Sequence, residues 1–165
     1  MPTAHHSLRA IPSGDGGTRA TLKEMRSIVR AWKTEPEMRR MAGLITARCP
    51  NKDWVCEVRS VQEWVRQNIR FTSDIAEVET LQTPELTLAQ RMGDCDDHSI
   101  LVATLLQAIG HPARFVAVDL TGGGYSHVFT ETPIGPYWHS VETTEPDYDL
   151  GDQPAGIRRR MVQRV

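Results

Sequence analysis

Hydrophobic residues recur at helical spacing through the first two thirds of the chain. Apolar positions three or four residues apart predict three amphipathic helices, one starting near Thr18 or Thr21, one over about 37–48 and one over about 54–69. One or two further helical turns are expected over 84–91. The run from Ile100 to Ile109 is apolar around nearly its whole circumference, which predicts a helix at the centre of the core.

The last third of the chain has a β-prone pattern instead. Segments rich in β-branched and aromatic residues, joined by a Gly-rich loop and a Pro-containing turn, predict an antiparallel meander over 113–119, 125–132 and 137–144. Residues 71–81 are expected to form a loop with a short strand, and Leu8 to Ile11 an additional edge strand. The expected fold class is α+β, with helices packed on a small antiparallel sheet.

Length and composition favour one globular domain. The chain has 165 residues, of which 39% are hydrophobic and 24% charged, and this length can bury a core without a metal. We expect a single domain over 18–150, an irregular segment over 1–17 and a basic tail over 151–165. The net charge of −2 gives no general field for nucleic acid, and no apolar run suits a signal peptide or a membrane span.

The cysteines are three in number, Cys49, Cys56 and Cys95. An odd count without framework spacing favours a reducing compartment, hence a cytoplasmic location, and at least one free thiol. Cys49 and Cys56 have no second Cys or His pair at zinc-ligand spacing, so we expect them to be buried thiols. We expect no metal and no cofactor.

One of these cysteines stands where a helix should begin. Gly93 permits a turn, Asp94 can cap the central helix, and Asp97 is placed to complete the cap. A helix N-terminus lowers the pKa of a thiol and directs free N–H groups at developing negative charge. The neighbouring aspartates oppose ionisation of Cys95, so a nucleophilic role requires a nearby cation. A small cysteine packed in a capped helix is the alternative.

A histidine and a carboxylate on the predicted sheet can supply that cation. His127 and Glu142 fall on neighbouring antiparallel strands, about 4.8 Å apart, and can share a face. Cys95, His127 and Glu142 would then act as nucleophile, base and orienting group. His98, three residues after the cysteine, is a competing base, and a hydrogen-bonded structural histidine is the alternative for His127.

Four motifs in order resemble the transglutaminase-like core of the papain-like fold. They are a helix ending in Asn68-Ile69-Arg70-Phe71, the Gly93-Asp94-Cys95 turn whose helix runs into Gly110-His111-Pro112-Ala113-Arg114, the strand Ser126-His127-Val128-Phe129, and Trp138 followed four residues later by Glu142. The resemblance spans about 61–146. It implies acyl chemistry through a thioester, with Cys95 as nucleophile, His127 as general base and then acid, and Glu142 as the third member.

Two positions depart from the family pattern. The family usually has Asp where this chain has Glu142; the longer side chain is workable but can shift the histidine. An upstream aromatic residue with a donor group often completes the family's oxyanion hole, but Phe71 has no donor. The Cys95 backbone N–H is then one donor, and Gln82 is a candidate for the second.

Three functions fit this reading. The first is a cysteine peptidase or amidase acting on a protein or peptide substrate, with water resolving the thioester. The second is a transglutaminase that uses an amine as acceptor. The third keeps the fold without the reaction, as a structural or assembly protein of a bacteriophage, because small stand-alone members with this cysteine turn resemble phage and bacterial proteins. Neither a membrane nor nucleic acid is expected as a partner, and the sequence does not specify the oligomeric state.

Overall fold

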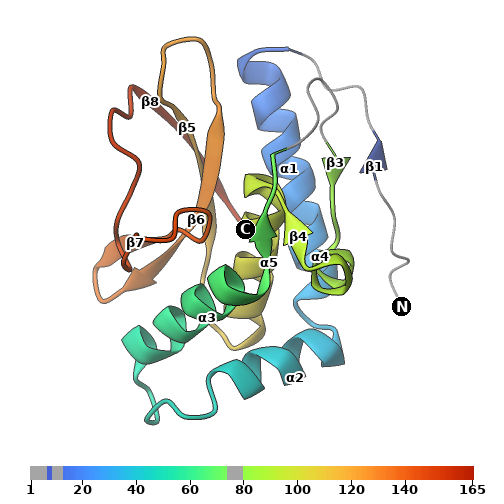
Figure 1. Cartoon of the computed structure of the whole chain (residues 1–165), viewed down its shortest axis with the longest axis vertical. Helices are drawn as coiled ribbons and strands as arrows, with labels where there is room; N and C mark the ends of the chain where they lie inside the picture. Colours follow the sequence, from blue (N-terminus) through green and yellow to red (C-terminus); the bar gives the residue numbers. More distant parts are fainter. Residues whose placement is uncertain (1–6, 9–12, 74–79) are drawn as a thin grey trace.

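The computed structural model describes residues 7–8, 13–73 and 80–165. Helices occupy one side of the molecule and a sheet the other (Figure 1). In chain order the elements are β1 (Ser7–Leu8), α1 (Asp15–Trp32), α2 (Pro36–Ile45), α3 (Trp54–Asn68), β2 (Arg70–Phe71), β3 (Thr80–Leu81), α4 (Pro84–Gln90), β4 (Met92–Gly93), α5 (Cys95–Ala108), β5 (Arg114–Asp119), β6 (His127–Ile134), β7 (Tyr137–Val141) and β8 (Arg159–Arg164).

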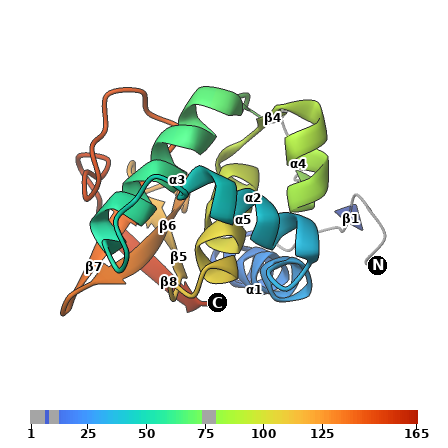
Figure 2. The same ribbon diagram turned by 90° about the horizontal axis from the view of Figure 1, so that it is seen from below.

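Helix α5 lies at the centre of the molecule, as its apolar circumference predicts. It contacts α1, α2, α3, α4 and strand β6, and Figure 2 shows it enclosed between the other helices and the sheet. Residues 97–106 of this helix are all buried. Because every side of α5 is covered, the position and direction of its N-terminus are fixed by packing on all sides.

The predicted helix boundaries hold where a capping side chain is present. Asp53 accepts a hydrogen bond from the Cys56 backbone N–H at 2.9 Å and caps α3, and Thr83 caps α4. Helix α1 has no side-chain cap; it begins at Asp15, three residues before the earlier of its expected starts. None of the helices in the described part of the chain is long and apolar enough to cross a membrane.

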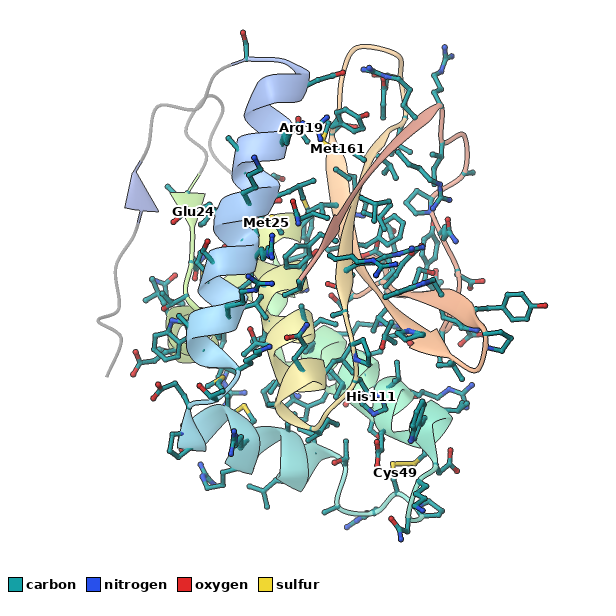
Figure 3. All side chains as sticks on the ribbon, turned by 180° about the vertical axis from the view of Figure 1, so that it is seen from behind. Arg19, Glu24, Met25, Cys49, His111 and Met161 are labelled. Atoms are coloured by element: carbon teal, nitrogen blue, oxygen red, sulfur yellow. A yellow bond between two sulfur atoms is a disulfide. The ribbon has the colours of Figure 1, made fainter. Side chains whose placement is uncertain are left out.

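The main sheet has four antiparallel strands in the order β7-β6-β5-β8. The predicted meander accounts for three of them. The fourth comes from the segment that the sequence separates as a basic tail: residues 159–164 pair with β5 along its full length. Met161 is the one buried residue of β8 and packs with Met25 of α1 between helix and sheet (Figure 3). Because the strand carries several positive charges, its single inward-facing position does not stand out in the sequence.

Both faces of β5 are buried, which explains its uninterrupted apolar run. Phe115 and Ala117 join the cluster formed with α1 and α5. Val116 and Val118 point the other way and pack with Phe129 of β6, against Leu120 and Ile157. Strands covered on both faces lose the alternation of polar and apolar positions. Because Ile157 packs on this second face, the chain after β7 returns across the outer face of the sheet.

Two short strand pairs lie near the N-terminus of α5. Strand β2 pairs in parallel with β4, with Phe71 opposite Gly93, and β1 pairs with β3. The pairing of β2 with β4 ties the end of α3 to the residue that precedes the cap of α5. Residues 9–11 of the expected edge strand and 74–79 of the expected loop lie outside the described residues.

Cys49 and Cys56 form a disulfide, so the prediction of two buried thiols is wrong. The bond joins the turn after α2 to the first turn of α3 at the foot of the molecule (Figure 3). The two cysteines are seven residues apart, and the chain between them turns back, with the Asp53 backbone N–H donating to the Pro50 carbonyl at 3.1 Å. A structural disulfide also removes the basis for inferring a reducing compartment from the cysteine count.

Candidate active site

The N-terminus of α5 is held by a reciprocal cap. Asp94 accepts from the Asp97 backbone N–H at 3.0 Å, and Asp97 accepts from the Asp94 N–H at 3.2 Å. The Asp97 carboxylate also accepts from the backbone and side-chain amides of Gln82, at 2.8 and 2.9 Å. A Cβ on Gly93 would lie 2.6 Å from the Asp97 Cβ, so glycine is required here by close approach. The cap fixes where the next residue, Cys95, can lie.

Cys95 is the first residue of α5 and the one free thiol, since the other two cysteines are bonded. Burial raises the pKa of this thiol well above its usual value, and the carboxylates of Asp96 and Asp94 raise it further. The backbone N–H of Val128 acts in the opposite direction by hydrogen bonding to the sulfur. The acidic neighbours and burial outweigh the helix N-terminus, so the resting thiol is neutral at neutral pH.

His127 and Glu142 form the other half of the site. The first residue of β6, His127, bonds through Nε2 to Glu142 Oε2 at 2.6 Å. Glu142 directly follows β7, and the pairing of Thr130 with Val141 brings the two side chains to the same face. The shared face that strand geometry predicts is thus present.

The Glu142 carboxylate is ionised despite being almost completely buried, with 1% of the residue exposed. Burial on its own would raise the pKa of this carboxyl, but the hydrogen bond and charge of His127 and the donors of Thr144 bring it below its usual value. An ionised Glu142 keeps a proton on the His127 Nε2 atom and leaves Nδ1 as the ring's free acceptor.

One cavity of about 270 Å³ brings the two halves together. Cys95 and Asp96 line it from α5, His127 from β6, and Thr18 from α1. Within residues 13–73 and 80–165, no hydrogen bond joins the sulfur of Cys95 to the His127 ring; the sulfur is bonded instead to the Val128 N–H. The nucleophile and base candidates therefore face a common space in the resting state.

Two other histidines, His98 and His111, take structural positions. His98 is 1% exposed, and its Nδ1 lies 2.9 Å from Thr143 Oγ1 rather than in the cavity. Burial lowers the pKa of His98 to about 4, which keeps the ring neutral at neutral pH. His111 is 4% exposed and bonds Glu57 at 2.6 Å. Neither histidine is placed to accept a proton from Cys95.

Gln82, the candidate for the second oxyanion donor, does not lie where it could take that role. Its side-chain amide donates to the Asp97 carboxylate at 2.9 Å, behind the helix end, and it does not line the cavity. Phe71 is 45% exposed, and its ring makes a T-shaped contact with the ring of His98. The Cys95 backbone N–H, at the first helical position, has no acceptor within the helix and remains the available donor.

Sequence reasoning missed the side chains that hold Glu142 from α3. Gln62 is 1% exposed and its Nε2 donates to the Glu142 backbone carbonyl at 2.9 Å. Arg66, one turn later, donates to the carbonyl of Pro146 at 3.1 Å. A signal was available: Gln62 falls between Val61 and Val65 on the buried face of an amphipathic helix, where a polar residue needs a partner.

Three solved structures of bacterial proteins are similar to this fold. A candidate cysteine protease from Cytophaga hutchinsonii is 18% identical, with 73% of this chain and 42% of that chain covered and a TM-score of 0.55. A candidate protease from Parabacteroides distasonis is 12% identical, with 86% and 36% covered and a TM-score of 0.61. Calcium-bound LapG from Legionella pneumophila is 14% identical, with 83% and 80% covered and a TM-score of 0.58.

At these identities the likeness establishes the fold, and this chain spans less than half the length of the first two proteins. The calcium belongs to LapG; in the described part of this chain no group of three His, Cys, Asp or Glu side chains is arranged to hold a metal ion. Among curated proteins, none matches the sequence. The model of the transglutaminase-like superfamily matches residues 39–143, well over half of the chain. The chain belongs to the transglutaminase-like superfamily.

Proposed function

We propose that the protein is a thiol acyl-transfer enzyme that hydrolyses a peptide or amide bond through a thioester on Cys95. His127 is the general base and then the general acid, and Glu142 orients its ring. The observation that carries the proposal is the bonded pair His127–Glu142 bordering the same cavity as the one free thiol, at the N-terminus of a buried helix.

In the proposed reaction each of these groups has one role. Nδ1 of His127 takes the thiol proton as the sulfur attacks the carbonyl carbon, and the negative charge on the carbonyl oxygen is met by the Cys95 backbone N–H. The imidazolium, stabilised by Glu142, gives its proton to the leaving amine. Water then attacks the thioester while His127 accepts its proton, and the carboxylic acid leaves as the thiol re-forms.

The raised pKa of Cys95 determines when this proton moves. A neutral thiol at rest favours general-base activation on substrate binding over a thiolate–imidazolium pair that is already formed. Asp94, Asp96 and Glu142, which disfavour a lone thiolate, also favour the imidazolium that accompanies attack. The same acidic groups therefore disfavour a thiolate in the free enzyme and stabilise the imidazolium that forms during attack.

The charge of the cavity indicates a substrate class. Asp94 and Asp96 line it, whereas no lysine or arginine among the described residues does. A peptide with a basic residue next to the scissile bond is therefore a better fit than an acidic one. A panel of fluorogenic peptide amides that differ only in that residue, basic, neutral or acidic, measures this preference as a ratio of kcat/KM.

The test of the function combines turnover with covalent labelling. Wild type should release the fluorophore, and Cys95→Ala should lose at least about a thousandfold of kcat. Intact-mass analysis without reductant should show a single alkylation by iodoacetamide, at Cys95, because Cys49 and Cys56 are bonded. Absence of turnover with every peptide, together with labelling no faster than in denaturant, would contradict the proposal.

An added primary amine separates the two acyl acceptors. If the enzyme hydrolyses its substrate, the amide of a glutamine or amide peptide is converted to the carboxylic acid even with excess amine present. If the product that carries the added amine dominates instead, the transglutaminase alternative is correct. A chain that is inert in both assays while folded would fit the structural or assembly alternative.

A further inference from the structure

The Glu142 carboxylate is held by its own turn as well as by His127. Oε1 accepts three hydrogen bonds, from the Thr143 N–H at 2.9 Å, the Thr144 N–H at 3.0 Å and the Thr144 hydroxyl at 2.9 Å. Oε2 is the atom bonded to His127. Both oxygens are therefore engaged, and each is engaged by a different part of the structure.

The turn that supplies these donors is fixed from two helices. Gln62 of α3 donates to the Glu142 carbonyl at 2.9 Å, and Arg66 donates to the carbonyls of Pro146 and Tyr148. From α5, His98 Nδ1 lies 2.9 Å from Thr143 Oγ1. All these contacts join residues at least 45 positions apart in the chain, so the turn is held by tertiary structure.

This arrangement explains how a glutamate can stand where the family usually has an aspartate. The additional methylene gives Glu142 one more rotatable bond, which would let the carboxylate leave the histidine. Three donors on Oε1 restrict that motion and leave Oε2 directed at His127. Of the two residues that donate to Oε1, only Thr144 also uses its side chain, so this hydroxyl can be removed without altering the backbone donors.

We propose that Thr144 is a positioning residue that, with the backbone turn held by Gln62 and His98, keeps the Glu142 carboxylate ionised and directed at His127. The inference rests on the proposed function for its effect on catalysis, but not for its effect on Glu142. Among the described residues, His127 of β6 and Cys95 and His98 of α5 are ionisable groups that interact with this carboxylate, whereas Arg66 of α3 donates to the Glu142 backbone carbonyl. Of these ionisable groups, His127 is the one that hydrogen-bonds the carboxylate directly.

The decisive variants are Thr144→Val, which keeps the shape and removes the hydroxyl, and Thr144→Ser, which restores a hydroxyl. Loss of one hydrogen bond to a charged group should lower kcat about tenfold or more with KM unchanged, and Thr144→Ser should recover most of it. Thr46→Val is the matched control, because Thr46 is also part-buried but its hydroxyl bonds the Ala42 carbonyl of α2, away from the site.

A second readout does not depend on turnover. In protein labelled with ¹³C at the glutamate carboxyl carbons, with Glu142 assigned from Glu142→Gln, the carboxyl should titrate below its usual range in wild type. The midpoint should rise by about one pH unit in Thr144→Val and return in Thr144→Ser. An unchanged midpoint in Thr144→Val, or a lowered KM with unchanged kcat, would overturn the inference. If wild type lacked activity but the midpoint moved as expected, only the proposed function would fail.

Discussion

At the helix end of the site, burial and the carboxylates of Asp96 and Asp94 work against a charged Cys95, whereas at the sheet end the partners of Glu142 overcome its burial and keep it charged. The helix end is built from neighbouring residues, in a cap that spans 94–97. The sheet end collects residues from α3, α5 and β6. The sheet end therefore holds a stable negative charge on Glu142, whereas the helix end disfavours one on Cys95.

The largest effect should come from the charge at the sheet end. Glu142→Gln removes the anion that stabilises the imidazolium and should lower kcat by about a thousandfold. Glu131→Gln is the matched control: Glu131 is 2% exposed, lies on the same strand as His127 and pairs with Arg114 at 2.6 Å, outside the cavity. Steady-state kinetics should show a normal kcat for the control. Equal losses in both variants would mean that Glu142 acts only through stability.

His98, which links the helix end to Thr143, makes stability depend on pH. Its pKa is about 4 in the folded protein against an ordinary value of 6.5. Between these values the unfolded chain binds a proton that the folded chain does not, so stability falls as the pH decreases from 6.5 to 4, by up to about 3 kcal/mol. Urea unfolding across this range should show a smaller fall for His98→Phe than for wild type.

That variant also loses the contact with Thr143, so its stability should be lower at pH 7 as well. The test therefore depends on how steeply the free energy of unfolding changes with pH, and not on its value at pH 7. Parallel stability curves for the wild type and His98→Phe between pH 6.5 and 4 would contradict the assignment of a neutral, buried His98.

The disulfide should support the fold but neither half of the site. It closes a short loop between α2 and α3, and removing it in Cys49→Ser/Cys56→Ser should cost about 2–3 kcal/mol of unfolding free energy by chain entropy. The kcat of the folded variant should be unchanged, because hydrogen bonds hold both halves. A variant of unchanged stability and reduced kcat would show that the bond acts on the site.

The smallest effect should come from the helix end. Asp96→Asn removes a charge that raises the pKa of Cys95 while leaving the cap between Asp94 and Asp97 in place. The pKa of the thiol should fall, and alkylation of Cys95 at pH 7 should become a few times faster. Asp152→Asn, whose carboxylate bonds the Asp149 N–H in an exposed turn, is the control. Slower alkylation in Asp96→Asn would contradict the claim that the Asp96 carboxylate raises the pKa of Cys95.

How far the sequence could predict this molecule depended on whether the signal was local. The cap at Asp94 and Asp97 and the buried circumference of α5 are written in adjacent residues, and the structure has both. The pairing of His127 with Glu142 followed from strand alternation, since two neighbouring strands leave few arrangements. The catalytic roles of Cys95, His127 and Glu142 stay predictions.

The features that escaped prediction depend on distant partners or on weak patterns. Strand β8 has one buried position among exposed arginines, so its periodicity resembles that of a solvated tail. Gln62 and Arg66 meet their partners 76 or more positions away. The local pattern shows that the buried Gln62 needs a partner, but it does not identify that partner. The disulfide needs only a turn that brings two cysteines together, and spacing alone did not distinguish it from two thiols.

The central claim is that His127 draws the proton from Cys95 although the resting thiol is neutral. The most direct measurement is the rate of Cys95 alkylation by iodoacetamide from pH 5 to 10, followed by intact mass, in wild type and His127→Ala. We predict that wild type reacts at least about tenfold faster at pH 7 and that the variant reacts only as the pH approaches the raised pKa of its thiol. Superimposable profiles for the two proteins would contradict the account.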